Sequence, residues 1–408
     1  MKSILTVVLT ALTLGVAPAH AEERVTLSLP DDWESPLAQA DLSVEEFREL
    51  PYEPEAYRGA EQLGLHPAYI SDVRAGLELL YNRQYREVRD HFLEVDERFP
   101  GTGIGAAIDV VVWQAMMLEN FDFRYDRQYE VSSRRARSEL EKALAEPGAP
   151  AGWLHFLMAG IAGIEAIHTM RKERYLPALT LAFEAMGHAG RSRRASPEFV
   201  DLLLADGIYN YWRTVVTRKN RMLPDFGDQR EEGIAQMQEV QGEGVFLATP
   251  AALSLAFTYI EERRMKAATT ATVTLARAYP DSIINNIVLG QVLTQNRRYD
   301  RAMDIWEQIE AQDPRNDRVH YVRALTLLRS GRSEEAIGSL ETYLSSEHLV
   351  DHHRAAGHYR MGQAQYRQEN YSEAVTQYRR AIRVNGHDGA RRALERMRRL
   401  RREGRIQF

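Results

Sequence analysis

Small residues recur in this sequence at a fixed interval of 34 residues, and this interval constrains the fold more than any other feature. Ala256, Gly290 and Ala324 lie 34 positions apart, twice in succession. Apolar residues are spaced by three or four positions from about residue 68 to residue 400, as on one face of a helix. The sequence holds no sustained apolar alternation that would indicate strands. A period of this length is typical of a repeat built from helices.

The same residue types follow several of these small residues, which we call anchors, at the same offsets. Offsets +9, +12, +16 and +24 from Gly290 hold Tyr299, Ala302, Trp306 and Pro314. The same offsets from Gly362 hold Tyr371, Ala374, Tyr378 and Gly386, and those from Gly76 hold Tyr85, Val88, Phe92 and Pro100. Small residues at the anchor and at +12 let two antiparallel helices approach, while the aromatic residues fill the space between them. The closing proline ends the second helix.

A 34-residue unit with these offsets resembles the tetratricopeptide repeat (TPR) family, whose unit is a helical hairpin. The resemblance covers residues 66–100 and 249–388. It weakens between residues 101 and 248, where first helices lack the small anchor or are lengthened. The resemblance implies an all-α fold, a TPR-like α-solenoid of antiparallel helical hairpins in which each hairpin packs on its neighbours and a C-terminal helix caps the array.

We predict five segments along the chain. Residues 1–21 form a signal peptide, 22–65 an N-terminal arm, 66–248 degenerate TPR-like repeats, 249–388 regular TPR repeats, and 389–408 an arginine-rich capping helix or tail. An insertion is expected near 213–228, because Gly207 and Gly233 are 26 residues apart where regular repeats have 12. The stretch "RKNRMLPDFGDQREEG" (218–233) ends that insertion. Within it, Asp228 followed by Glu231 predicts a capping-box start of a helix.

The N-terminus predicts export. Lys2 precedes an apolar run from Ile4 to Ala17, and Ala19, His20 and Ala21 form a small-x-small cleavage site. The run is 14 residues long, whereas a membrane span needs roughly 20. We therefore expect cleavage near Ala21 and a soluble periplasmic or secreted protein without a transmembrane segment. The sequence has no cysteine, which excludes disulfides, thiolate metal sites, a thiol nucleophile and a lipid-modified cysteine.

Charge is distributed unevenly. The chain has a formal net charge of −6, yet residues 391–405 hold eight Arg and two Glu. Ala390, Leu394, Met397 and Leu400 form a narrow apolar stripe at helical spacing, which favours a capping helix with a solvated basic face. Peripheral association with the envelope through a lipid-headgroup patch, or binding of a partner, are the alternatives. Nucleic acid binding is not expected, because the chain is acidic and the arginines have no interleaved aromatic residues before Phe408.

Motifs that carry catalysis or bind metals and cofactors are absent or incomplete in this sequence. It has no H-E-x-x-H, P-loop or G-x-S-x-G pattern, and "GTGIG" (101–105) follows Pro100 as expected for a turn. Glu165 and His168 have the spacing of a di-iron ligand pair, but a second such motif is missing, which favours a packed pair. The cluster from His348 to His358 in "HLVDHHRAAGH" is interpreted as a linker, with a Zn or Ni site as the alternative. We therefore predict no catalytic residue, cofactor or metal.

The TPR resemblance implies a binding function along the surface of the first helices, where such arrays hold an extended peptide or a partner helix. The offsets −3, +1, +4 and +5 from the anchors Gly290, Ala324 and Gly362 would face this groove. From these positions the predicted partner-binding set is Gln291, Gln295, Tyr321, Arg329, Tyr359, Gln363, Tyr366 and Arg367. The mixture suits a polypeptide ligand, with the reservation that some tyrosines pack between helices. The predicted function is a non-catalytic periplasmic scaffold or adaptor in cell-envelope assembly.

An enzyme or ligand-binding protein with a pocket in the divergent middle region is the alternative function. Trp153, His155, Glu165 and His168 would line such a pocket. Convergence of His155 and Glu165 on a closed cavity would favour this alternative. An open surface of polar and aromatic residues would favour the scaffold.

Overall fold

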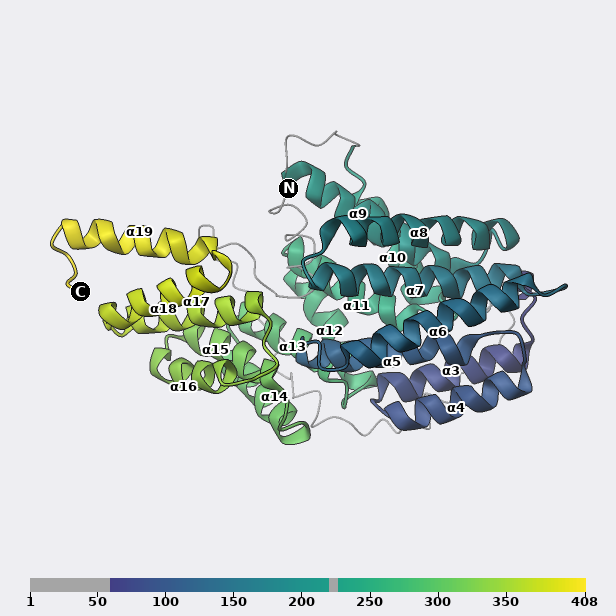
Figure 1. Ribbon diagram of the computed structural model, residues 1–408, viewed down its shortest axis with the longest axis horizontal. Coiled ribbons are helices and arrows are strands. Elements are labelled where there is room, and N and C mark those ends of the chain that lie inside the picture. The colour runs from purple at the N-terminus through teal and green to yellow at the C-terminus, as the bar shows by residue number, and fades with distance from the viewer. Residues whose placement is uncertain (1–58, 220–226) are drawn as a thin grey trace. The chain divides into compact units, whose positions relative to one another are not determined.

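The structure is a computed structural model that describes residues 59–219 and 227–408. The predicted signal peptide and most of the predicted N-terminal arm lie outside these residues. The described residues form seventeen α-helices, α3 to α19, two short 3-10 helices, η2 (Glu61–Leu63) and η3 (Val200–Leu202), and no strand (Figure 1). The predicted all-α class is confirmed. Among the described helices, none combines the length and the hydropathy that a membrane span requires.

Sixteen of these helices follow one another as eight hairpins, and α19 (Asp388–Arg402) stands after the last of them. The hairpins are α3 (Pro67–Tyr81) with α4 (Tyr85–Arg98), α5 (Ile104–Asn120) with α6 (Asp126–Ala145), α7 (Ala151–Arg171) with α8 (Tyr175–Ala195), α9 (Leu203–Lys219) with α10 (Arg230–Glu243), α11 (Ala248–Glu261) with α12 (Met265–Ala278), α13 (Ile283–Gln295) with α14 (Tyr299–Gln312), α15 (Asp317–Ser330) with α16 (Ser333–Leu344), and α17 (Asp351–Arg367) with α18 (Tyr371–Asn385). The degenerate region between residues 101 and 248 therefore holds three hairpins.

The helices belong to two compact units. The first comprises the chain up to Met116 together with Tyr125–Asn285, and the second comprises Met117–Arg124 together with Asn286–Phe408. The division between the units falls within α13, whereas the sequence placed a boundary between degenerate and regular repeats at residue 249. Each unit is built from the same kind of hairpin.

Anchor glycines make room for the aromatic residue at offset +16. A Cβ added at Gly290 would lie 2.3 Å from Cη2 of Trp306, and one added at Gly362 would lie 2.6 Å from the ring of Tyr378. Both distances are far below an ordinary carbon–carbon contact of about 3.5–4.0 Å. The aromatic ring therefore occupies the space that a side chain at the anchor would take.

Where the anchor is alanine, the residue at offset +16 is smaller. Ala256 is paired with Thr272, and Ala324 with Leu340, and all four residues are buried. A larger anchor thus goes with a smaller residue at offset +16, as expected when two side chains fill one space, since close packing leaves little space unfilled. The sequence offsets and the packing describe the same contact.

One backbone conformation recurs at the turn of the hairpins. The residue at offset +7 has a positive φ in the regular hairpins: Arg83 (60°), Arg263 (56°), Arg297 (60°), Gly331 (88°) and Glu369 (60°). Left-handed backbone at a helix end satisfies the last carbonyl groups of that helix. Phe121 and Glu173 adopt the same conformation, with φ of 58° and 59°, so the divergent hairpins α5–α6 and α7–α8 use the same turn without the small-residue signature.

The divergent hairpins also have longer helices, as expected. Helices α6, α7 and α8 contain 20, 21 and 21 residues, against 14 in α14. In the next hairpin, Gly207 and Gly233 pack backbone to backbone, because a Cβ on either would lie within 2.8 Å of the other's carbonyl oxygen. These two glycines are the close contact between α9 and α10 that their spacing predicted. Residues 220–226 of the expected insertion lie outside the described part of the chain.

The end of α5 is held by the start of α15 within the second unit. Arg318 donates to the carbonyl of Leu118 at 2.9 Å, and Asn316 donates to the carbonyl of Glu119 at 3.3 Å. The guanidinium of Arg318 also lies over the Phe121 ring, 4.7 Å from its centroid. The last carbonyls of a helix have no partner within that helix, and here side chains from α15 supply one.

The C-terminal helix α19 covers the last hairpin. Ala390, Leu394, Met397 and Leu400 are buried in one cluster with Tyr378 of α18 and its neighbours. The predicted apolar stripe thus packs on α18, and the arginines of α19 are exposed. Helix α19 is the cap that the spacing indicated.

Candidate partner-binding surface

The structure divides ten of the twelve predicted groove positions into a buried and an accessible group, and the other two, Tyr359 and Tyr366, are half-buried. Offsets −3 and +4 are buried in the first two of these repeats, where Ile287, Thr294, Tyr321 and Leu328 are 1%, 4%, 6% and 5% exposed. Offsets +1 and +5 remain accessible. These accessible positions, which we call the first-helix surface, are Gln291, Gln295, Leu325, Arg329, Gln363 and Arg367. Positions three or four residues from the anchor share its helix face, so they point with it toward the second helix.

Tyr321 is the clearest correction to the predicted partner-binding set. Its ring centroid lies 5.0 Å from that of Tyr343 on α16, and both residues are buried. The tyrosine is therefore a core residue of the α15–α16 hairpin. The sequence could not separate the two faces, because a tyrosine suits a packed core and a binding surface equally well.

Tyr359 and Gln363 take part in the attachment of the cap. The Tyr359 ring stacks on His387 with a centroid distance of 4.7 Å, and its hydroxyl accepts from Gln363 Nε2 at 3.0 Å. Arg360 donates to Gln363 Oε1 at 2.8 Å. His387 in turn accepts from the backbone N–H of Ala390 at the start of α19. These half-buried side chains link α17 to α19, so an alanine at Tyr359 would disturb the cap as well as any ligand.

The other two members of the set on α17 also contact neighbouring helices. Tyr366 meets Tyr371 of α18 edge to face, with a centroid distance of 5.5 Å. Arg367 donates to the carbonyl of Leu328 at the end of α15. These contacts leave the Arg367 residue exposed, so part of it is accessible to a ligand.

Gln291, Gln295 and Arg329 are the polar members of the first-helix surface that have no polar partner within the described part of the chain. Their side chains have no hydrogen bond or ion pair with other described residues. The pKa of Arg329 is lowered, first because the surrounding protein displaces water and second because Arg360 carries the same charge nearby. Two amides and an uncompensated guanidinium offer donors and acceptors to the main chain of an extended polypeptide, or to its carboxylates.

Two residues of the alternative middle site have structural partners. Trp153 is 1% exposed, donates from Nε1 to the carbonyl of Thr102 at 3.0 Å, and packs edge to face on Tyr69. His155 faces His188 of α8, with 3.1 Å between the two Nδ1 atoms. Burial lowers the pKa of both histidines. Trp153 is a core residue, and His155 is paired across the α7–α8 hairpin.

Glu165 and His168 bind different partners although they share a helix. Glu165 accepts from Arg137 Nε at 3.0 Å to each carboxylate oxygen. His168 is buried, and its Nε2 lies 2.7 Å from Asp126. Burial lowers the pKa of His168 to about 4, so its ring is neutral near pH 7. The four residues proposed for a middle pocket therefore do not converge on one site.

Members of the histidine cluster are spread over separate contacts. His353 is buried against Phe121, with ring centroids 4.7 Å apart, and His358 lies 2.8 Å from Gln377 of α18. Within residues 59–219 and 227–408, no group of three or more His, Asp or Glu side chains is placed to hold a metal. In the "GTGIG" turn, the amide of Gly105 donates to the Asp96 carboxylate at 3.0 Å. This amide is therefore already hydrogen-bonded to a carboxylate of the chain.

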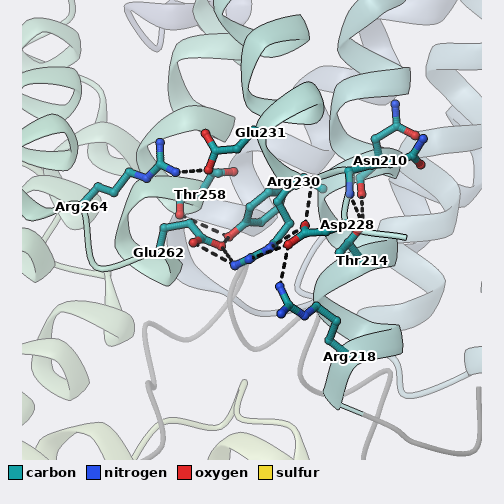
Figure 2. Close-up of polar contacts among 11 residues, drawn as sticks. Asn210, Thr214, Arg218, Asp228, Arg230, Glu231, Thr258, Glu262 and Arg264 are labelled. Atoms are coloured by element: carbon teal, nitrogen blue, oxygen red, sulfur yellow. Dashed lines mark hydrogen bonds and ion pairs between the residues drawn. The ribbon is translucent and has the colours of Figure 1, made fainter. Parts of the chain in front are cut away.

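The charged stretch at residues 218–233 joins helices of the first unit (Figure 2). Asp228 is 2.6 Å from Arg218 and 2.8 Å from Arg230, and Arg230 reaches Glu262 at the end of α11 at 2.9 Å. Glu231 is paired with Arg264, which precedes α12. The charges of Arg218, Asp228, Arg230 and Glu231 thus form ion pairs between helix ends.

The predicted capping box at this point was wrong in its details. Helix α10 begins at Arg230, after Gln229 as the N-cap, and Gln229 makes no side-chain cap. Asp228 lies one position earlier and accepts from the backbone N–H of Arg230 at 3.2 Å. Glu231 is drawn to Arg264 instead of turning back to the helix start, because a guanidinium is a stronger partner for a carboxylate than a backbone amide.

A buried carboxylate that sequence reasoning missed organises the start of α11. Asp201 in η3 is 1% exposed and accepts from the backbone N–H groups of Val245, Phe246 and Leu247 at 2.8, 2.8 and 2.6 Å. Burial raises the pKa of Asp201 to about 6. Its partners are 44 to 46 residues away in sequence, which explains why no local pattern pointed to it.

Comparison with known proteins agrees with these offsets and contacts. Models of the tetratricopeptide repeat match residues 287–347 and residues 355–388. These two segments of the chain are thus similar to tetratricopeptide repeats. Proteins of this family are in general non-catalytic scaffolds for protein interaction, so a protein partner follows as the general expectation. No curated protein sequence matches this chain.

Solved structures of repeat proteins resemble it at low identity. A tetratricopeptide repeat protein from Parabacteroides merdae ATCC 43184 is 14% identical, with a TM-score of 0.40, over 69% of this chain and 97% of that one. MamA from AMB-1 is 18% identical, with a TM-score of 0.30, over 46% and 97% of the two chains. The TPR domain of P58(IPK) is 16% identical, with a TM-score of 0.25, over 83% and 100%.

Proposed function

We propose that this protein is a non-catalytic scaffold or assembly adaptor of the cell envelope that acts in the periplasm. It binds an extended segment of a polypeptide partner along the first-helix surface. The observation that carries the proposal is the accessibility of offsets +1 and +5 in three successive repeats. Gln291 and Gln295 are partly exposed there, Arg329 is exposed, and none of the three side chains has a polar partner among the described residues.

The surface chemistry supports a polypeptide over a small apolar ligand. Amide side chains match the hydrogen-bonding groups of a peptide main chain, and Arg329 and Arg367 add a positive charge for carbonyl or carboxylate oxygens. The buried residues at offsets −3 and +4, which are Ile287, Thr294, Tyr321 and Leu328, fix the position of these first helices. Preorganised polar groups on a rigid element bind with less loss of entropy on association.

Site-specific photocrosslinking in intact cells tests the binding surface. A photoreactive phenylalanine analogue placed at Gln295 or at Arg329 should crosslink to the same polypeptide, identified by mass spectrometry. The same analogue at Arg315, an exposed residue in the loop before α15, is the matched control and should not. The first-helix surface would be refuted if the analogue crosslinked to that polypeptide only from position Arg315, or if it captured no polypeptide from Gln295 and Arg329.

Affinity measurements with the crosslinked polypeptide complete this test. The variant Gln291→Ala, Gln295→Ala, Arg329→Ala should bind it at least about tenfold more weakly, since central polar anchors each contribute of order 1 kcal/mol or more. Helical circular dichroism should be unchanged, because the three side chains form no hydrogen bond or ion pair with other described residues. Arg315→Ala removes the same charge and should bind as the wild type does.

Export is tested separately. The intact mass of the protein purified from its native cell should correspond to a chain that lacks residues 1–21, and the protein should be released with the periplasmic fraction. Replacing Ala19 and Ala21 by aspartate should leave the precursor uncleaved, since the protease requires small residues there. A full-length protein in the cytoplasmic fraction would contradict the proposed location. It would not bear on the proposed binding surface.

A further inference from the structure

A pocket outside the first-helix surface lies between α18 and α19 in the second unit. Its volume is about 340 Å³, and its lining residues are Arg379, Ile382, Arg383, Arg391, Leu394, Glu395 and Arg398. Four guanidinium groups and one carboxylate thus face one pocket, with two aliphatic side chains among them. We call it the α18–α19 pocket.

Three of the four cations of the pocket have no carboxylate partner among the described residues. Among the described residues, Arg379, Arg383 and Arg398 form no ion pair, and Arg391 has only Asp388 at 3.8 Å, with both side chains largely exposed. Exposed pairs of this kind contribute little to stability. Like charges four residues apart on a helix, as at Arg379 and Arg383, are unfavourable for folding. Stability of the cap alone therefore does not account for this arrangement.

The other second helices of the second unit carry different residues at these places. The offset of Arg379 from its anchor is +17, and the same offset holds Glu307 in α14 and Glu341 in α16. Both glutamates are exposed. The reversed charge is thus confined to the hairpin beneath α19. It extends the basic face of α19 onto α18, so that arginines of both helices line the pocket.

The aliphatic residues of the pocket restrict the chemistry of its ligand. Leu394 is 6% exposed, and Ile382 is half-buried beside it. An apolar surface lined also by four arginines suits a segment in which carboxylates flank an apolar side chain. Guanidinium groups bind carboxylates through paired hydrogen bonds, while a leucine or phenylalanine would bury area on the aliphatic floor.

Other anionic partners fit less well. The lining has no aromatic side chain on which a nucleic acid base could stack. Insertion into a lipid surface needs exposed large apolar residues beside the cations, and within the described residues none of the exposed large apolar side chains lies on α18 or α19. Inorganic phosphate would make no use of the apolar floor.

We propose that the α18–α19 pocket is a second binding site, specific for an acidic polypeptide segment that carries an apolar side chain between its carboxylates. The carboxylates bind Arg379, Arg383, Arg391 and Arg398, and the apolar side chain rests on Ile382 and Leu394. This site shares no residue with the first-helix surface. It stands or falls independently of that proposal.

Fluorescence anisotropy with a labelled peptide of sequence EELEEFEEL tests the site in the full mature protein. The variant Arg379→Glu, Arg383→Glu should bind this peptide at least about tenfold more weakly, because two charge-assisted contacts are replaced by repulsion. The matched control is Arg392→Glu, Arg396→Glu, which changes the net charge equally at exposed positions of α19 outside the pocket. This control should stay within about threefold of the wild type. Circular dichroism and thermal melting of both variants should match the wild type.

Probe variants separate the two parts of the proposed ligand. The peptide QQLQQFQQL, which lacks charge, and EEAEEAEEA, which lacks the apolar side chains, should each bind much more weakly than the parent peptide. Equal losses in the pocket variant and the control variant would show a diffuse charge effect and refute the site. Binding to phosphatidylglycerol vesicles that depends on Arg379 and Arg383, with no peptide binding, would replace the acidic polypeptide by a lipid surface and also refute the proposal.

Discussion

Gly290→Ala should lower the free energy of unfolding of the second unit by about 1–3 kcal/mol, the usual loss when a methyl group is forced into a filled core. The added Cβ would lie 2.3 Å from Cη2 of Trp306. The Trp306 ring cannot retreat easily, because it is fully buried and its Nε1 donates to Thr326 of α15 at 2.9 Å. Urea unfolding and hydrogen exchange in α13 and α14 would measure the loss.

A second substitution should relieve the first. Trp306→Leu in the wild-type background removes ring volume and should itself destabilise by about 2 kcal/mol or more. Combined with Gly290→Ala it recreates the alanine–leucine pair found at Ala324 and Leu340, so the double variant should be more stable than the sum of the single losses by about 1 kcal/mol. Simple additivity would show that the two positions do not share a volume.

Gly338→Ala is the matched control for this pair. Gly338 lies within α16, and a Cβ added there meets no atom within 4 Å. The same chemical change at this site should stabilise the protein by about 0.5–1 kcal/mol, because glycine is a poor helix former. A loss at Gly338 similar to that at Gly290 would remove packing as the explanation.

Asp201→Ala should destabilise the first unit by about 3 kcal/mol or more, since three buried backbone N–H groups would lose their acceptor together. These groups belong to Val245, Phe246 and Leu247 and are held at 2.6 to 2.8 Å. Asp201→Asn keeps one oxygen for the amides of Phe246 and Leu247 but turns an N–H toward Val245. Its loss at pH 7 should therefore be smaller than that of the alanine variant, as measured by urea unfolding.

The pH dependence of the asparagine variant tests the state of the Asp201 carboxyl. Its pKa is raised to about 6 by burial, against about 3.9 in an unfolded chain. Protonation of the Asp201 carboxyl therefore stabilises the folded state fully below about pH 4, and this stabilisation is lost as the pH rises through about 6. The wild type should lose up to about 3 kcal/mol relative to Asp201→Asn between pH 4 and pH 7, from two pKa units at 1.36 kcal/mol each. If the stability of the wild type relative to Asp201→Asn increased with pH instead, a raised pKa of Asp201 would be contradicted.

Much of the repeat fold was predictable because its contacts are local. The distance in sequence from Gly290 to Trp306, or from Gly362 to Tyr378, is the same in every regular hairpin, so a single offset describes a packing contact. The turn residue with positive φ escaped notice, since Arg83, Arg297 and Glu369 are not residue types that mark such a conformation.

Interactions between distant segments were beyond the sequence pattern. The partners of Asp201 come from the loop before α11, and the charged partners of Glu165 and His168 come from α6. Which face of a first helix is accessible also depends on its neighbours, so Tyr321 was grouped with Arg329 although only Arg329 is exposed. The basic face of α19 was predicted, but its pocket also requires Arg379 and Arg383 of the preceding helix.

Contacts of Arg318 and Asn316 with the end of α5 have a consequence for the order of folding. The bonded groups are 200 and 197 residues apart in sequence, whereas the contacts within a hairpin span few residues. Chains fold more slowly as the mean separation of their contacts grows. During synthesis, residues 117–124 leave the ribosome long before α15 exists. The second unit is therefore complete only when its first and last parts have both been made, and a fragment that starts at residue 286 would lack the segment on which Arg318 rests.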